Sequence, residues 1–151
     1  MSGKLTHIDE EGNSRMVSVI DKPHSKRVAL AEGWILLTPK TLALISNQAI
    51  QKGDVLSIAQ LAGIMATKKT ADLIPLCHPI PIDAVDVRLK IHDKGVHIQA
   101  TVSNVWKTGV EMEALTAVTV AALTVYDMVK AVEKTGVITD IHLIRKDKIP
   151  V

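Results

Sequence analysis

The segment from Gly109 to Glu133 constrains the fold of this chain more than any other, because it predicts one long helix with an unusually wide apolar surface. At about 100° per residue, its polar side chains fall within about a third of the circumference. We call these positions the polar stripe: Glu113, Thr116, Thr124, Asp127 and Lys130. A surface helix is ordinarily polar over about half of its turn, and one sheet cannot cover all the rest. We therefore expect burial on two sides, by a sheet and by a neighbouring subunit.

Two interpretations of the polar stripe remain open from the pattern alone. In the first, it is a solvated face on which Asp127 and Lys130 form an i,i+3 ion pair that contributes a few tenths of a kcal/mol. In the second, the same carboxylate and ammonium lie in a half-buried cleft, where burial and the partner shift both pKa values and make an acid/base pair. Helical periodicity does not separate these two interpretations.

Upstream of this helix, the sequence predicts a strand, two helices and a hairpin. The expected elements are a strand over 27–37 interrupted at Gly33, a helix from Thr38-Pro39 to about Asn47, a helix after Asp54, and a hairpin of strands over 84–92 and 98–102. Thr38 and Asp54 are side chains that cap helix N-termini, and proline suits the first helical position. Alternating apolar residues give the hairpin one buried face.

The start and end of the long helix complete the predicted element order. Thr108 and Glu111 have the spacing of a capping box, and Gly136 ends the helix before a last strand over 137–145. The order matches the β-α-β-β-α-β plan of a ferredoxin-like α+β protomer with an extra helix, in which an antiparallel sheet packs on helices. We expect one domain over residues 1–151, with a mobile N-terminal arm over 1–26.

Composition argues against several classes of protein. The 151 residues include only 2% aromatic side chains and carry a net charge of +2, so binding to nucleic acid is not expected. Cys77 is the only cysteine and the six histidines show no ligand spacing, so we expect neither a disulfide nor a metal site. No secretory signal is visible, and polar residues interrupt the longest apolar run. We therefore expect a cytoplasmic protein without a membrane span.

A rigid segment and several lysines are further candidates for a site. Residues 73–82, LIPLCHPIPI, contain three prolines that forbid a helix interior, so the chain is expected to be extended around Cys77 and His78. A lone cysteine or loop histidine is ordinarily structural, but a stiff backbone can aim an imidazole at an anion. Lysines at element ends are either plain surface charges or part of a phosphate site beside a helix N-terminus. They are Lys52, Lys68, Lys69 and Lys107.

Three long segments carry a resemblance that covers nearly the whole chain. They are HIDEEGNSRMVSVIDKP (7–23), KGDVLSIAQLAGIMATKKTADLIPLCHPIPI (52–82) and KTGVEMEALTAVTVAALTVYDMVKAV (107–132). The motifs LCHP, GVEMEALTA and YDMVKAV within them are highly specific. On these motifs the chain resembles the cyclic pyranopterin monophosphate synthase family, the C proteins (MoaC) of molybdenum-cofactor biosynthesis.

The resemblance implies a reaction and an assembly. Members of the family rearrange a GTP-derived substrate, cyclic dihydro-GTP, to cyclic pyranopterin monophosphate and release diphosphate as the cyclic phosphate closes. No redox change occurs, so no cofactor is expected. The family is a homohexamer, a trimer of dimers with ferredoxin-like protomers and active sites at the dimer interface. This arrangement agrees with the two-sided burial expected for the long helix.

The family's functional residues transfer to matching positions of this chain. The resemblance implies that the catalytic residues are Asp127, Lys130 and Lys52. It implies that the substrate-binding residues are Leu76, Cys77, His78, Met112, Glu113, Glu111, Lys68 and Arg27. In the mechanism expected from these matches, the cations and His78 hold the triphosphate, and Glu113 hydrogen-bonds the guanine-derived ring. Asp127, Lys130 and Lys52 then transfer protons.

Two other functions compete with catalysis. One is a regulatory module on a ferredoxin-like scaffold that binds a nucleotide without turnover. The other is a purely structural oligomer, in which the pair of Asp127 and Lys130 is an interface salt bridge. Release of diphosphate under turnover separates an enzyme from both.

Overall fold

The computed structural model describes residues 6–151 and has the expected α+β architecture. Its elements are β1 (Ser25–Leu36), α1 (Pro39–Ser46), α2 (Val55–Thr67), α3 (Thr70–Leu73), β2 (Ala84–His92), β3 (Gly95–Trp106), α4 (Glu111–Val129) and β4 (Val137–Pro150). The four strands form one sheet in the order β2-β3-β1-β4, and every neighbouring pair is antiparallel. The ferredoxin-like plan is confirmed, with α1 and the single-turn α3 added to it.

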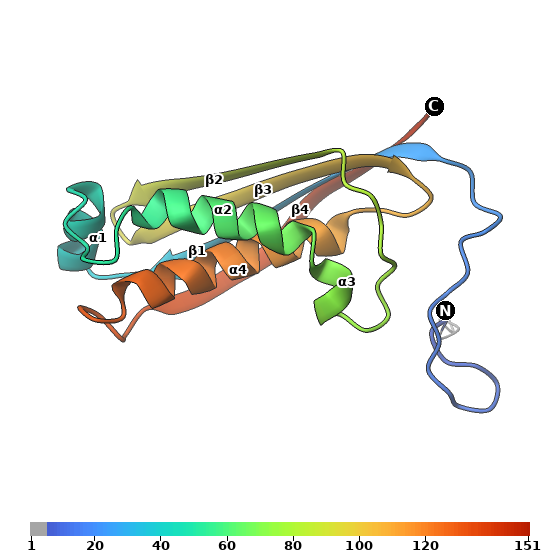
Figure 1. Ribbon diagram of the computed structural model, residues 1–151, viewed down its shortest axis with the longest axis horizontal. Coiled ribbons are helices and arrows are strands. Elements are labelled where there is room, and N and C mark those ends of the chain that lie inside the picture. The colour runs from blue at the N-terminus through green and yellow to red at the C-terminus, as the bar shows by residue number, and fades with distance from the viewer. Residues whose placement is uncertain (1–5) are drawn as a thin grey trace.

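Helices α2 and α4 lie side by side on one face of the sheet, with α1 at one end and α3 at the other (Figure 1). The predicted starts of α1 and α2 are confirmed, because Thr38 and Asp54 accept hydrogen bonds from the backbone N–H groups of Thr41 and Ser57. Both caps are local, so the sequence alone predicts where these helices begin.

Helix α4 is buried on two sides, as its wide apolar surface requires. One side packs on the sheet, and the other packs on α2, where a Cβ at Gly63 would lie 3.0 Å from the Ala117 carbonyl oxygen. The second cover therefore comes from α2 of the same chain, whereas we expected it from a neighbouring subunit. Although α4 is long and apolar enough to cross a membrane, half of it is buried within the chain, as in the core helix of a soluble protein.

The predicted limits of the long helix, Gly109 and Glu133, are wrong at both ends. The capping box does not form: α4 begins at Glu111, and its N-cap, Val110, makes no side-chain cap bond. The Glu111 carboxylate instead accepts a hydrogen bond from Lys146 at 3.1 Å. At the other end, Val129 is the last helical residue and Lys130 is the C-cap, well before Gly136. Asp127 therefore lies in the last turn of α4.

The other differences from prediction concern strand length and the arm. The last strand runs to Pro150 rather than ending at residue 145, and β1 is continuous, with a register shift against β4 beside Gly33. Residues 6–24 form no regular element apart from one bridge between Ile8 and Ser14. Residues 1–5 of the predicted arm lie outside the described residues, and the mobility of the arm stays a prediction.

Candidate active site

The three residues expected to be catalytic meet at the C-terminal end of α4. Lys52, on the turn before α2, donates from Nζ to the Asp127 carboxylate at 3.0 Å and to its backbone carbonyl at 2.9 Å. Lys130 Nζ lies 2.9 Å from the other carboxylate oxygen of Asp127. This contact requires α2 and α4 to run antiparallel, because Lys52 precedes one helix and Asp127 ends the other. We call these three residues the lysine–aspartate cluster.

The lysine–aspartate cluster is open to solvent in the single chain. The side chains of Lys52, Asp127 and Lys130 are 42%, 55% and 50% exposed. Hydrogen bonds from Lys130 and Lys52 lower the pKa of Asp127 below its usual value, and the bond from Asp127 raises the pKa of Lys130. Both shifts hold the groups in their charged forms. In the single chain the pair is therefore solvated, as in the first interpretation of the polar stripe, and no half-buried cleft encloses it within residues 6–151.

The LCH triplet, residues 76–78, and the start of α4 line a pocket of about 270 Å³ at the opposite end of that helix. We call it the histidine pocket, and it is lined by Leu76, Cys77, His78, Ile80, Thr108, Gly109, Glu111, Met112 and Glu113. The proline-rich segment is held in place from β3. Asn104 Nδ2 donates to the Pro81 carbonyl at 2.9 Å, and the Asp83 carboxylate accepts from the Val105 N–H at 2.8 Å.

Two ionisable groups in the histidine pocket are perturbed by burial. Glu113 is only 4% exposed, and burial raises its pKa to about 7, with a further rise caused by the neighbouring Glu111 carboxylate. Burial also raises the pKa of the Cys77 thiol, and Glu113 adds to that rise. A thiol kept neutral is a poor nucleophile, so the surroundings of Cys77 do not favour thiolate chemistry. Glu113, by contrast, exchanges a proton near neutral pH.

A second pocket, of about 220 Å³, adjoins the histidine pocket and gathers three cations beside two carboxylates. It shares Gly109 and Glu111 with the histidine pocket and is lined further by Arg27, Lys146, Asp147 and Lys148. Lys146 and Lys148 were not among the predicted site residues, because the last strand was expected to end at residue 145. The period-two pattern of β4 beyond that point is the signal that places Lys146 and Lys148 on one side of the strand.

Lys68 lies near the histidine pocket but outside it. It lines a separate pocket of about 340 Å³ with Asp83 and apolar residues, and the two pockets share only Ile80. Lys68 caps the C-terminal end of α2. Because α2 and α4 are antiparallel, Lys68 lies toward the end of the helix layer that carries His78, and away from Lys52.

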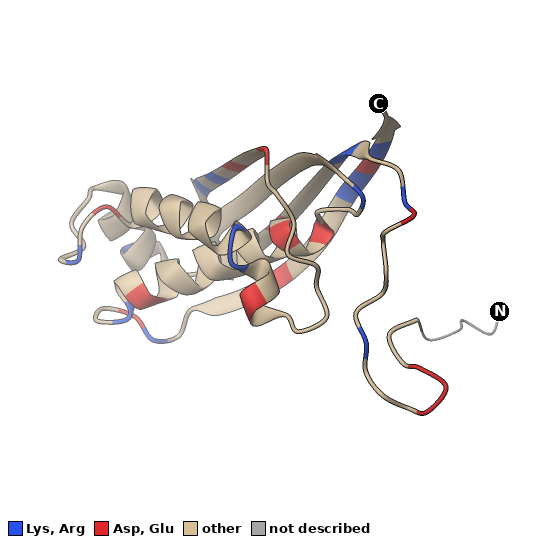
Figure 2. Cartoon of the chain, turned by 45° about the vertical axis from the view of Figure 1, so that its right-hand side comes forward, with Lys and Arg blue, Asp and Glu red and all other residues tan. Residues whose placement is uncertain are grey.

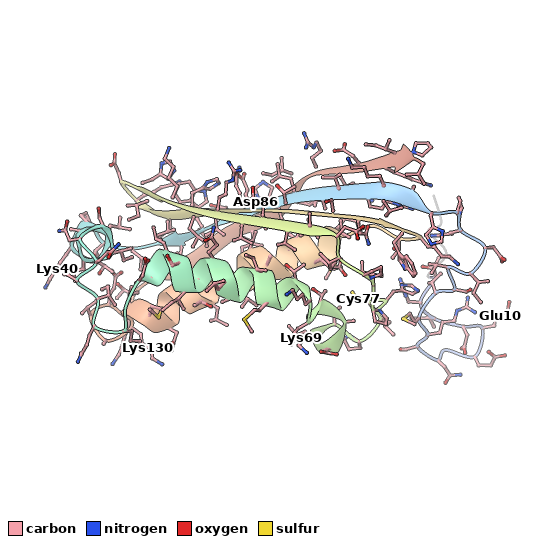
Figure 3. All side chains as sticks on the ribbon, turned by 45° about the horizontal axis from the view of Figure 1, so that its top comes forward. Glu10, Lys40, Lys69, Cys77, Asp86 and Lys130 are labelled. Atoms are coloured by element: carbon pink, nitrogen blue, oxygen red, sulfur yellow. The ribbon has the colours of Figure 1, made fainter. Side chains whose placement is uncertain are left out.

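The eleven candidate residues thus divide between two ends of the helix layer. Glu113 and Asp127 are fourteen positions apart on α4, which separates them by about 21 Å along the helix axis. Figure 2 shows acidic positions at both ends of α4 and none between, and Figure 3 shows Lys130 and Cys77 toward opposite ends of the helix layer. The division follows chemistry: the expected catalytic residues lie at one end, and the expected binding residues lie at the other.

A metal site needs several His, Cys, Asp or Glu side chains close together. Within residues 6–151, no three His, Cys, Asp or Glu side chains gather in an arrangement that would hold a metal ion. The candidate residues supply the ammonium groups of Lys52 and Lys130, the ionised carboxylate of Asp127, the carboxyl of Glu113 with its pKa of about 7, and the imidazole of His78. Such groups bind anions and transfer protons.

The chain is similar to known proteins along almost its whole length. The model of the MoaC family matches residues 16–148. A relative from Dinoroseobacter shibae is 58% identical over 150 residues, which are 97% of this chain and 94% of the relative. Relatives from Thermomicrobium roseum and Streptomyces griseus are 56% and 54% identical, over 95% and 93% of this chain and 87% and 79% of their own lengths. All three are named cyclic pyranopterin monophosphate synthase.

Proposed function

The chain belongs to the MoaC family, and on that premise we propose that it is a cyclic pyranopterin monophosphate synthase. As such it is a lyase of molybdenum-cofactor biosynthesis that converts cyclic dihydro-GTP to cyclic pyranopterin monophosphate and releases diphosphate. The observation that carries this proposal is the shared name of relatives more than half identical over nearly the entire chain. The cytoplasm, where a GTP-derived substrate is made, is the proposed location.

We assign substrate binding to the end of α4 that carries the histidine pocket. His78, Arg27 and Lys68 supply positive charge or hydrogen bonds for a triphosphate, and the N-terminus of α4 adds a favourable dipole. Glu113 faces the same pocket with a pKa of about 7. A carboxyl that is neutral part of the time both donates to and accepts from the guanine-derived ring, which carries donors and acceptors on one edge.

We assign proton transfer to the lysine–aspartate cluster. Lys52 and Lys130 are ammonium donors, and the Asp127 carboxylate between them orients both. Opening of the imidazole ring requires protons to be delivered to nitrogen, and closing the cyclic phosphate requires one to be removed from a hydroxyl. In the open single chain, the pKa shifts of this cluster run away from neutrality. Burial of Lys130 against a partner copy moves its pKa back toward neutrality.

We propose that two copies of the chain complete each site. A twofold axis that crosses α4 at Val120, midway between Glu113 and Asp127, makes the two copies of α4 antiparallel and brings the catalytic end of one to the binding end of the other. The open face of α4 supports this arrangement, because it exposes Leu123 and Met112. Three such dimers form the proposed homohexamer.

Asp127→Asn tests the assignment of the catalytic cluster. We expect diphosphate release in a single turnover of cyclic dihydro-GTP to slow by at least about a hundredfold, the usual contribution of a general acid–base group. Lys52→Ala is expected to slow it comparably. The matched control is Asp72→Asn, because Asp72 also pairs with a lysine at i,i+3 spacing, Lys69, on the surface. Near-normal release by both cluster variants would refute these roles.

The same variants separate the competing functions. A regulatory module would bind cyclic dihydro-GTP without releasing diphosphate even in the unmodified chain. A structural salt bridge would make Asp127→Asn lower the stability of the oligomer and leave turnover per intact oligomer unchanged. Size-exclusion chromatography of Asp127→Asn, read beside the single-turnover rate, distinguishes these outcomes from catalysis.

A further inference from the structure

Within the N-terminal arm, the segment Met16–Ile20 lies against the protein with one side. Exposure alternates along it: Val17 and Val19 are partly buried, whereas Met16, Ser18 and Ile20 are exposed. Period-two alternation is the pattern of an extended segment with one face toward the protein. Figure 1 shows the arm passing beside the loop that follows α3, which is the loop that carries His78.

The segment contacts the predicted binding end at two points. The Val17 carbonyl oxygen is hydrogen-bonded to Nε2 of His78, sixty-one positions away in the chain. The Ile20 carbonyl accepts from Lys107 Nζ at 2.9 Å. The Lys107 carbonyl in turn accepts from Arg27 Nη2 at 3.3 Å. The arm is therefore connected to two of the predicted substrate-binding side chains, His78 directly and Arg27 through Lys107.

The contact with Val17 has a chemical consequence for His78. A backbone carbonyl only accepts, so Nε2 of His78 must carry the proton in this arrangement. The remaining nitrogen, Nδ1, is then the one left for a ligand. A hydrogen bond from one ring nitrogen to a backbone carbonyl fixes the ring orientation of a functional histidine. Val17 itself does not line the histidine pocket, so it acts on the ligand only through the imidazole.

We propose that Met16–Ile20 is a positioning strap, which anchors Nε2–H of His78 and so holds the ring in one orientation, with Nδ1–H of the protonated imidazole left to donate to the phosphate chain of the substrate. This inference rests on the proposed function. Without the strap, the His78 imidazole is no longer held in one orientation, so substrate binding is weakened. The lysine–aspartate cluster at the other end of α4 is unchanged. The expected signature is a higher KM with little change in kcat.

Two shortened chains test the strap. A chain that begins at Asp21 lacks both contacts, whereas a chain that begins at Gly12 loses only the first part of the arm and keeps them. We expect the chain from Asp21 to raise KM for cyclic dihydro-GTP by roughly three- to tenfold, the worth of one hydrogen bond, with kcat within about twofold. The chain from Gly12 is expected to match the full-length protein in both constants.

A double-mutant cycle shows whether the strap acts through His78. In a His78→Gln background, the chain from Asp21 is expected to raise KM by less than about twofold, because the ring that the strap orients is gone. An equal rise in both backgrounds would mean that the arm serves folding or another residue, and would overturn the inference. Equal KM values for all three chain lengths would overturn it as well.

A full-length variant covers the case in which the chain from Asp21 does not fold. Val17→Ser with Val19→Ser removes the inward apolar side chains that seat the strap, and is expected to raise KM as the truncation does. Ile20→Ser is the matched control, since that side chain is 77% exposed. If the double variant binds normally, the strap is refuted. A full-length chain that releases no diphosphate at all would instead count against the proposed function.

Discussion

At the scale of single residues, Glu113 departs furthest from ordinary ionisation. It was one of five polar positions in a helical stripe, and helical periodicity alone did not distinguish it from Asp127. The structure separates the two carboxylates: Glu113 is buried and its pKa is raised to about 7, whereas Asp127 is exposed between two ammonium groups and its pKa is lowered. Environment, not residue type, gives them different chemistry.

The raised pKa of Glu113 predicts a pH-dependent stability. Its folded pKa of about 7 exceeds the value of 4.5 expected for the unfolded chain. Between these values the folded state binds more protons, so the free energy of unfolding falls as pH rises through this window, by at most about 3 kcal/mol. Denaturant titrations at several pH values should show this slope in the native protein and a flatter profile in Glu113→Gln.

The control for this prediction is Glu10→Gln, because Glu10 lies on the exposed arm. That variant should retain the slope of the native protein. A Glu113→Gln profile as steep as the native one would show that another group causes the pH dependence. Diphosphate release should also weaken in Glu113→Gln through KM, since the amide cannot lose a proton.

At the scale of elements, the close packing of α2 on α4 holds the site together. Gly63 allows the helices to approach, since a Cβ there would meet the Ala117 carbonyl oxygen at 3.0 Å and Val87 Cγ1 at 3.3 Å. The same packing brings Lys52, ahead of α2, to Asp127 in the last turn of α4. The caps of α1 and α2 were predictable, but this helix–helix contact was not, because a glycine within a helix has several possible causes.

Gly63→Val should therefore force α2 and α4 apart. The added side chain overpacks the interface, and we expect the free energy of unfolding to fall by about 2–3 kcal/mol and Tm by roughly 5–10 °C. Leu61→Val on the same helix, at a side chain 60% exposed, is the control for the poorer helix propensity of valine. Similar losses in both variants, measured by thermal unfolding, would show that the contact at Gly63 contributes little.

At the scale of the whole molecule, the candidate site residues form two separate groups. The histidine pocket and the lysine–aspartate cluster lie at opposite ends of α4, about 21 Å apart, which exceeds the reach of one small substrate. The wide apolar surface of this helix already indicated that more than one surface covers it. The structure assigns one of these surfaces to α2, and leaves the open face with Met112 and Leu123 for the proposed partner copy.

Mixing two impaired variants tests whether each site combines residues from two copies of the chain. Asp127→Asn damages the catalytic end and His78→Ala damages the binding end, so each alone should release diphosphate much more slowly than the native chain at a substrate concentration below the native KM. If each site combines the two ends from different copies, a mixed dimer contains one site with both defects and one site with none. Co-refolding equal amounts should then restore about a quarter of native activity. Activity no higher than that of the separate variants would place both ends of each site within one chain.

The sequence alone determined the order of the four strands and of α1, α2 and α4, the caps at Thr38 and Asp54, and the family, because helix caps and motifs depend on neighbours a few positions away. Only the tertiary structure decided how the candidate residues are grouped. It placed Lys52 against Asp127 across seventy-five positions and kept Glu113, on the same helical stripe as Asp127, at the far end of the helix. The physical reason is that periodicity reports which side of a helix a residue occupies, whereas rise along the axis and packing between helices determine what it meets.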